Sequence, residues 1–184
     1  CFKSNTYELY SNILLNEYIN LSVRAFKSNI QNNIEYISNK YQNDSDNIDL
    51  NQSGLNKQIN VKFKNTNLNF FSSFLSSKKE NNASQLRRPN KNYGLNVYRK
   101  IKNNLFGNLT LNLKYNHYGK HFDTHSTNFS TIEMDSTDLI DLKITKKLNN
   151  GNFYIKLTNV LDETYQRPHG YNHENRIIKF GMSY

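Results

Sequence analysis

The stretch RIIKFGMSY (Arg176–Tyr184) has the pattern of a β-strand with one apolar face and one polar face. Successive side chains of a strand point to opposite faces, so residues two positions apart share a face. One face would therefore carry Ile178, Phe180, Met182 and Tyr184. Such a strand fits many soluble folds, and its meaning depends on whether the rest of the chain repeats the pattern.

The same alternation recurs along the whole chain. Apolar residues alternate with Asn, Lys, Ser or Thr in one stretch after another, and no helical period of useful length competes with them. Together with the terminal stretch, these segments predict about nine strands. They cover residues 6–14, 19–25, 59–64, 68–75, 93–97, 109–116, 140–144, 153–158 and 178–184.

The composition indicates either a chain that is largely loop or strands that keep one face in water. Hydrophobic residues make up 36% of the 184 residues, whereas aromatic residues reach 13%, with 13 Tyr and 11 Phe. No run approaches the roughly 18 apolar residues of a membrane-spanning helix. The strands of a transmembrane β-barrel need only about 10 residues of alternating polarity, so the composition is compatible with that fold.

The predicted connections alternate between short and long. Short turns fall near residues 16–17, 64–66, 102–107 and 149–151, whereas long polar connections fill residues 31–49, 77–92, 119–138 and 162–175. Outer-membrane barrels have short periplasmic turns and longer extracellular loops, while β-sandwiches require no such alternation. The predicted fold is therefore an all-β, antiparallel transmembrane β-barrel portion. Tyrosines near the strand ends would either form its aromatic girdles or be ordinary strand residues, and they are Tyr10, Tyr18, Tyr93, Tyr98, Tyr115 and Tyr118.

An open sheet of about nine strands would leave two edges with unpaired backbone groups in lipid. Bacterial single-chain barrels also have even strand numbers. We therefore expect residues 1–184 to be the C-terminal segment of a larger barrel, with further strands upstream.

Four segments of the sequence resemble the closing part of TonB-dependent outer-membrane receptors. They are TYELY at residues 6–10, LRRPNKNYGLNV at 86–97, NFYIKLTNVLDETYQ at 152–166 and GYNHENRIIKFGMSY at 170–184. The resemblance covers essentially the whole chain. It is closest to the vitamin B12 receptor branch and its siderophore-receptor relatives.

The resemblance implies a barrel of about 22 strands whose lumen holds an N-terminal plug domain. It also implies a TonB-type energy transducer, a small-molecule nutrient ligand that is cobalamin-like or a metal chelate, and the outer membrane of a Gram-negative bacterium as the location. The plug and the TonB box would lie outside this sequence. Phe180, Met182 and Tyr184 would form the terminal signal that the barrel-assembly machinery recognises, in a strand that closes the barrel within outer-membrane lipid.

Three histidines of HYGKHFDTH, His117, His121 and His125, are spaced four apart at the start of a predicted long loop, and they are the candidate metal ligands of the chain. His169 and His173 lie in the next such loop. Structural zinc sites usually show tighter Cys/His spacing. We therefore expect no metal site and no cofactor.

Basic residues supply the candidate ligand and lumen contacts: Arg87 and Arg88 after a long loop, and Arg24 and Lys114 on inward positions of strands. Arginine binds carboxylates well, so Arg87 and Arg88 could contact an anionic ligand or could pair with Asp or Glu of the protein itself. No nucleophile motif or carboxylate pair frames a catalytic site, and we expect no enzyme.

The formal net charge of +9 would also suit a nucleic-acid partner. Lys and Arg are spread along the chain, however, without a basic stripe that stacking aromatics interrupt, so we expect no nucleic-acid binding. The leading hypothesis is an outer-membrane receptor for a scarce nutrient. The alternative is a surface-attached or soluble β-sheet adhesin or carbohydrate-binding module.

Overall fold

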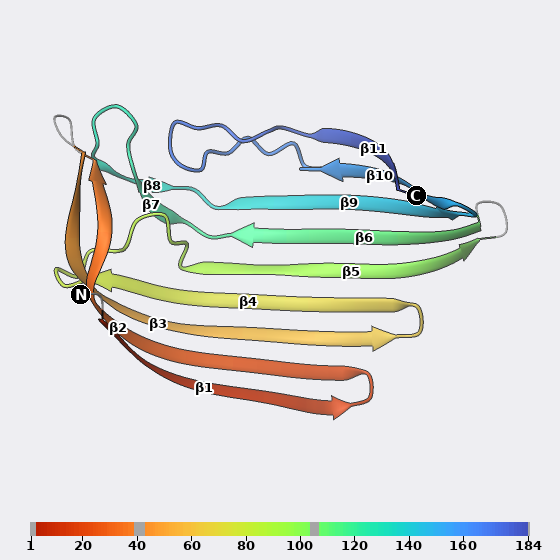
Figure 1. Cartoon of the computed structure of the whole chain (residues 1–184), viewed down its shortest axis with the longest axis horizontal. Coiled ribbons are helices and arrows are strands. Elements are labelled where there is room, and N and C mark those ends of the chain that lie inside the picture. The colour runs from red at the N-terminus through yellow and green to blue at the C-terminus, as the bar shows by residue number, and fades with distance from the viewer. Residues whose placement is uncertain (1–2, 39–42, 104–106, 184) are drawn as a thin grey trace.

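The computed structural model describes residues 3–38, 43–103 and 107–183, and every regular element in these ranges is a β-strand. Nine strands form one antiparallel sheet in the order β1-β2-β3-β4-β5-β6-β9-β10-β11, and β7 pairs with β8 in a small separate sheet (Figure 1). The strands are β1 (Lys3–Asn16), β2 (Ile19–Ser38), β3 (Asn43–Phe63), β4 (Thr66–Lys79), β5 (Lys91–Asn103), β6 (Gly107–Tyr118), β7 (His121–Thr124), β8 (Thr131–Met134), β9 (Thr137–Leu148), β10 (Gly151–Thr158) and β11 (Ile177–Ser183). The predicted all-β antiparallel fold is confirmed.

The strand register places most of the alternating apolar residues on one face. One cross-strand row of this apolar face runs from β2 to β11 through directly paired residues. Its members are Ile19, Val61, Leu68, Val97, Leu113, Leu142, Leu157 and Ile178. Each side chain packs against its cross-strand neighbours, which is the interaction that stabilises a sheet.

The opposite, polar face is built in the same way from hydrogen-bonding side chains. The row next to the apolar one pairs Asn20, Asn60, Asn69 and Asn96 on successive strands. Asn69 Nδ2 donates to Asn60 Oδ1 at 2.6 Å, and Asn96 Nδ2 donates to Asn69 Oδ1 at 3.2 Å. The polar residues therefore form a ladder that satisfies part of its own hydrogen bonding.

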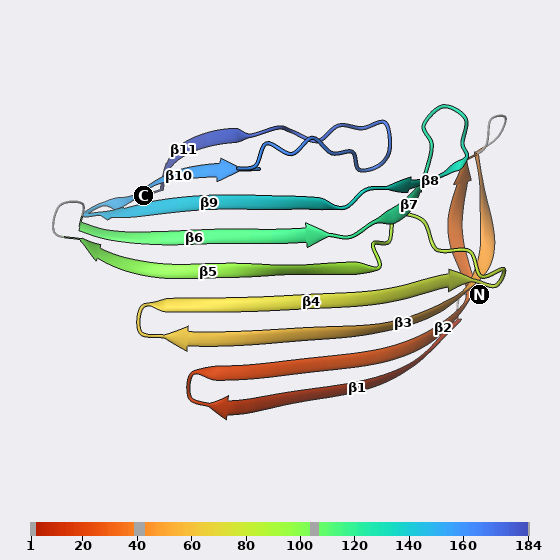
Figure 2. The ribbon, with the colours of Figure 1, turned by 180° about the vertical axis from the view of Figure 1, so that it is seen from behind.

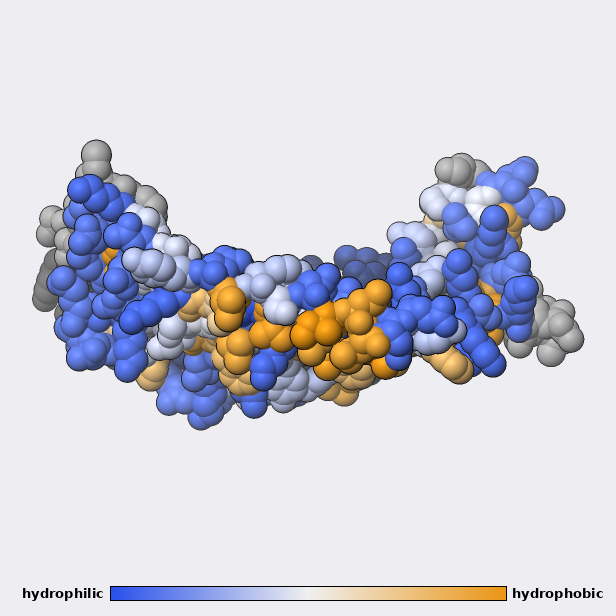
Figure 3. Space-filling view, turned by 90° about the horizontal axis from the view of Figure 1, so that it is seen from below, coloured by the Kyte–Doolittle hydropathy of each residue, from blue (hydrophilic) through white to orange (hydrophobic). Residues whose placement is uncertain are grey.

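The sheet is a single curved wall rather than a two-layered domain. Among the described residues, Leu50 is the one hydrophobic residue with a buried side chain. Apolar side chains instead gather in a band across the middle of the strands, with hydrophilic residues at both ends (Figure 3). On the apolar face Leu9 is 75% exposed and Phe180 is 66% exposed. This face therefore exposes a contiguous apolar surface, as surfaces that contact lipid or another protein do.

Three glycines let aromatic rings lie flat on the polar face. Gly94 pairs with Phe71, and a Cβ atom on Gly94 would come within 2.6 Å of the Phe71 ring. The same arrangement joins Gly54 to Phe26 and Gly181 to Tyr154. A ring that covers a paired glycine fills the space that the missing side chain leaves.

The ends of the sheet differ, as the sequence predicts. Tight turns at residues 17–18, 64–65 and 149–150 lie at one end, and the long connections lie at the other (Figures 1 and 2). Residues 104–106, at the remaining predicted turn, lie outside the described range. The connection at 162–175 is a loop, as expected.

Two of the predicted long loops contain regular structure. The prediction of a loop at residues 31–49 is wrong, because β2 continues to Ser38 and β3 begins at Asn43. The sequence of this segment is mostly polar and has no sustained alternation, so periodicity does not mark it as strand, and backbone pairing defines it. The segment 119–138 contains the β7–β8 hairpin.

A β-bulge bends the long β2–β3 hairpin away from the wall (Figure 1). The register shifts between Ile30 and Asn33, and Asn32 adopts φ of 56°. The Asn32 backbone N–H donates to Asp49 Oδ1 at 2.9 Å. An extra residue in one strand kinks the ladder and re-aims the hairpin beyond it.

The predicted aromatic girdle is only partly correct. Tyr93 and Tyr115 lie on the apolar face near the loop end, with ring centroids 6.3 Å apart. Tyr18 and Tyr98 instead line a hollow on the polar face. Nearness to a strand end does not decide the face, because a shift of one residue reverses it.

Tyr10 and Tyr118 also lie on the polar side of their strands, where they are opposite Arg24 and Asn92.

The sheet ends in two strands, β1 and β11, that have a described neighbour on one side only. In the part of the chain that the structure describes, no helix has the length and apolar character needed to cross a membrane.

Candidate functional site

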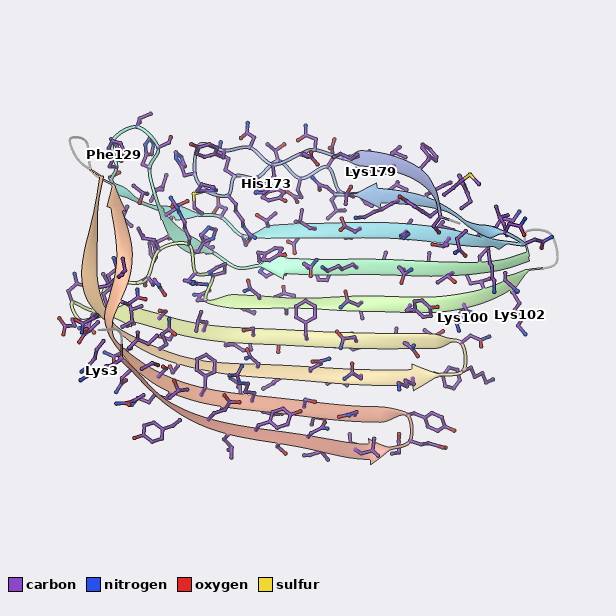
Figure 4. All side chains as sticks on the ribbon, viewed as in Figure 1. Lys3, Lys100, Lys102, Phe129, His173 and Lys179 are labelled. Atoms are coloured by element: carbon purple, nitrogen blue, oxygen red, sulfur yellow. The ribbon has the colours of Figure 1, made fainter. Side chains whose placement is uncertain are left out.

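A hollow of about 720 Å³ lies at the loop end of the sheet, and we call it the loop hollow. Four segments that are far apart in sequence meet there: the bent part of β2, the β4–β5 connection, the β7–β8 hairpin and the β10–β11 connection (Figures 1 and 2). Phe129, at the tip of the β7–β8 hairpin, is labelled in Figure 4. The lining residues are Asn33, Ile34, Gln85–Arg88, Thr124–Ser126, Phe129, Pro168, His169 and Tyr171.

A single buried carboxylate, Asp123, ties three of these segments together. Its side chain has 0% exposure. Oδ1 accepts hydrogen bonds from Arg87 Nε and from the Thr124 backbone N–H, both at 2.7 Å, and Oδ2 accepts from the His169 backbone N–H at 2.8 Å. The Arg87 backbone N–H also donates to the Phe122 carbonyl at 2.7 Å. We call the Asp123 contacts the Asp123 clasp.

The clasp keeps Asp123 ionised although it is buried. Burial by itself raises the pKa of this carboxyl, because a charge loses its hydration. The Arg87 guanidinium and the two backbone N–H donors outweigh burial and hold the pKa of Asp123 below its usual value. With these donors the buried carboxylate holds the three loop segments together. Removing the donors would leave a buried charge without compensation, which is destabilising.

Two histidine rings contact each other at a tilted angle where the β7–β8 hairpin meets the β10–β11 connection. The rings of His125 and His169 have centroids 4.4 Å apart. His169 Nδ1 accepts a hydrogen bond from the Ser126 backbone N–H at 3.0 Å. Gly170, with φ of 86°, lies against Ser126 so closely that a Cβ atom would stand 2.7 Å from the Ser126 Cβ. The close approach of the two loops therefore requires glycine at this position.

Arg87 and Arg88 both line the loop hollow, but their electrostatic situations differ. Arg87 is paired with Asp123, as the alternative reading of the sequence predicts, although 61% of its side chain stays exposed. Arg88 forms no ion pair with any carboxylate that the structure describes. The hollow therefore combines one uncompensated guanidinium with flat rings from Phe129 and Tyr171. This combination suits a ligand with anionic and planar groups.

A second cluster anchors the β10–β11 connection on the end of β6. The Arg167 guanidinium lies 3.9 Å from the ring centroid of Tyr118 and 6.0 Å from that of Tyr165. The Tyr165 ring stacks on His173 with centroids 4.6 Å apart, and His173 Nε2 lies 3.0 Å from the Arg167 carbonyl (His173 is labelled in Figure 4). Burial lowers the pKa of Arg167, while the two phenols oppose this effect.

The predicted histidine set does not converge on one point. His117 lies on the apolar face, where its ring stacks on Tyr93 at 4.4 Å and its Nδ1 lies 2.9 Å from Asp138 Oδ1. The strand ends at Tyr118, so His121 and His125 belong to separate surroundings. No group of three or more His, Cys, Asp or Glu residues in the described ranges is arranged to hold a metal ion.

His121 is buried in β7, and burial lowers its pKa.

The other two basic residues predicted as ligand or lumen contacts lie on the polar face of the wall. Arg24 forms an ion pair with Glu8 at 2.7 Å. Lys114 lies opposite Asp141 in the register of the β6–β9 ladder. Neither residue lines the loop hollow.

The predicted terminal signal lies on the apolar face of β11. Phe180 pairs with Ile155, and Met182 pairs with Phe153. Both side chains are exposed on a strand that has one described neighbour. Tyr184 lies outside the described residues.

Sequence reasoning missed Asp123 and the role of His169. Asp123 lies between two candidate histidines in HFDTH, and its alternation with buried His121 is visible only once β7 is known to be a strand. The His169 contribution to the clasp comes from its backbone N–H, for which side-chain identity gives no signal.

No protein-family model and no curated protein matches the chain. Solved structures do match. The ferripyoverdine receptor of the outer membrane of Pseudomonas aeruginosa has a TM-score of 0.78 at 15% identity, over 98% of this chain and 27% of that chain. The ferric yersiniabactin uptake receptor FyuA from Yersinia pestis has a TM-score of 0.72 at 17% identity, over 98% and 28%.

The copper transporter OprC has a TM-score of 0.78 at 8% identity, over 95% of this chain and 29% of that chain. The chain thus spans less than a third of the length of these solved structures. At such low identity the likeness shows the fold alone. The described sheet has the fold of a section of the barrel wall of outer-membrane receptors.

Proposed function

We propose that this chain is the C-terminal part of the barrel of a TonB-dependent nutrient receptor in the outer membrane of a Gram-negative bacterium. The single observation that carries the proposal is the wall itself. One face carries an unbroken cross-strand row of apolar side chains from β2 to β11, the other carries the polar ladder, and the long connections gather at one end (Figure 1). In an outer-membrane barrel these features are the lipid face, the lumen and the extracellular side.

Two open edges support a larger barrel. Strand edges that are unpaired in lipid are prohibitively costly, so β1 and β11 require further strands as neighbours. The remaining strands, the plug domain, the TonB-type transducer and recognition of the terminal strand by the barrel-assembly machinery belong to the same proposal. The small share of the matched receptors that this chain covers supports it.

The loop hollow is the proposed ligand-capture site, and its ligand is a metal chelate. Arg88 supplies an uncompensated charge, and the clasp holds the surrounding loops in place. The named solved structures transport or receive ferric chelates and copper, which favours a metal chelate. The cobalamin-like ligand rests on the sequence resemblance alone.

Uptake by the full-length protein tests the proposal. In cells that lack their own siderophore receptors, expression should allow growth on at least one ferric chelate of a panel, and this growth should require the TonB-type transducer. Arg88→Gln should reduce uptake about ten- to a hundredfold, because it removes a charge-assisted contact of about 1.5–3 kcal/mol. Arg99→Gln, on the apolar face of β5, is the matched control and should have no effect.

Two outcomes would overturn the proposal. One is a full-length protein that stays in the aqueous fraction after detergent-free extraction. The other is growth on the panel that is the same with and without the protein.

A further inference from the structure

A row of lysines crosses the polar face at the C-terminal side of the wall. Lys143, Lys156 and Lys179 are directly paired on the neighbouring strands β9, β10 and β11. Lys179 is labelled in Figure 4. Neighbouring strands lie about 4.8 Å apart, so the three side chains leave the wall side by side. We call them the lysine row.

No described carboxylate neutralises the lysine row. No Asp or Glu lies in five of the neighbouring strands, namely β4, β5, β6, β10 and β11. In β9, Asp141 is the one carboxylate on this face. Asp141 Oδ1 already accepts the Asn159 backbone N–H at 3.0 Å. Lys143 Nζ lies 4.3 Å from the ring centroid of Tyr154, a contact that leaves its charge in place.

Like charges that are directly opposite on paired strands destabilise a sheet. Three lysines in one cross-strand row are therefore unfavourable for the stability of the sheet, which suggests that their charges serve another purpose. The charge is not confined to the row, because further lysines share the polar face. Lys62 and Lys114 line the hollow of about 670 Å³ on this face, and Lys147 continues along β9 toward the turn end.

We propose that the lysine row binds multiply charged anions, and that the nutrient which passes along this wall is an anionic chelate. The inference rests on the proposed function, in which the polar face lines the lumen. Rings of Lys or Arg make pores selective for anions. The uncompensated Arg88 at the loop hollow has the same sign, so an anion would meet positive charge at both positions.

Lysine reactivity in the purified full-length protein tests this inference. The protein is treated with an amine-acylating reagent at low ionic strength, and the labelling rate of each lysine is read by mass spectrometry. A ferric tris-catecholate complex is the anionic probe, and a ferric tris-hydroxamate complex of similar size is the neutral one. Lys146 is the matched control, because it lies on the same strand and the opposite face.

The tris-catecholate complex should slow labelling of the lysine row about tenfold, while Lys146 is unaffected. Salt at about 1 M should abolish the protection, because it reduces the screening length to roughly 3 Å. Lys156→Gln should weaken the protection of Lys143 and Lys179. Lys146→Gln should not.

Three results would overturn the inference. The first is equal protection by the neutral complex, and the second is no protection by either complex. The third is a lysine row that is unreactive before any anion is added, which would show that an acidic polypeptide surface already covers it. None of these results affects the uptake experiment with Arg88→Gln, which tests the receptor assignment separately.

Discussion

The strand wall and the loop end of this molecule are stabilised in different ways. In the wall, each residue of a row contacts two similar neighbours, as Leu113 does between Val97 and Leu142, so stability is distributed over many equivalent pairs. At the loop end, Asp123 alone joins three segments of the chain. The wall should therefore tolerate most conservative substitutions, whereas the loop end should depend on one residue.

The largest effect is expected from Asp123→Ala. The substitution leaves the Thr124 and His169 backbone N–H groups, which are part-buried, without an acceptor. Each unpaired donor of this kind costs about 1–3 kcal/mol, whereas Arg87 is largely exposed and keeps its hydration. Hydrogen exchange of the Thr124 and His169 amides should accelerate accordingly, while the wall amides keep their protection. Asp135→Ala is the control, since the Asp135 side chain is 93% exposed. Unchanged exchange at His169 would show that the clasp does not hold the loops.

Leu113→Arg tests the assignment of the two faces of the wall. A charge on the lipid face near mid-membrane costs about 2–4 kcal/mol in a barrel, so folding of the full-length protein into bilayers should be weakened by that amount. Asn116→Arg, on the polar face of the same strand with the uncharged Gly94 and Leu139 opposite, should cost less than about 1 kcal/mol. Equal effects of the two substitutions in a denaturant titration would contradict the proposed lipid and lumen faces.

Gly94→Ala should be the most harmful small change within the wall. The added Cβ atom would lie 2.3 Å from the Tyr115 carbonyl oxygen and within 2.6 Å of the Phe71 ring, so the backbone and the ring must both shift. Overpacking of this kind costs about 1–3 kcal/mol. A denaturant titration should show it, and Ser72→Ala on the opposite face should have little effect.

Much of the wall was predictable from the sequence, because alternation fixes both the strands and their faces. Leu109, Leu111 and Leu113 needed no further information to be placed on one side of β6. The bent β2–β3 hairpin was not predictable, since its sequence has no sustained alternation of polar and apolar residues. The Asp123 clasp was not predictable either, because two of its three donors are backbone groups that come together only in the tertiary structure.

Acid should open the loop end before it affects the wall. The pKa of Asp123 is lowered by folding, so its contribution to stability is complete above the unfolded value of about 3.9 and is lost as the pH falls through the lower folded value. The loss is at most about 1.4 kcal/mol for each pH unit between the two values. His169 amide exchange, corrected for its intrinsic pH dependence, should be constant from about pH 7 to 5 and rise below about pH 4. The variant Asp123→Asn should show no such rise.

The smallest effect is expected from Glu133→Gln, which removes a solvent-exposed ion pair at the loop end. Lys120 Nζ lies 3.0 Å from Glu133 Oε1, and both side chains are at least half exposed. The pKa of Lys120 is raised by this carboxylate, yet water and salt screen exposed pairs and side-chain ordering opposes them. Exchange of the β7–β8 amides should therefore not change measurably. A change as large as that of Asp123→Ala would mean that surface charge, rather than the buried carboxylate, organises the loops.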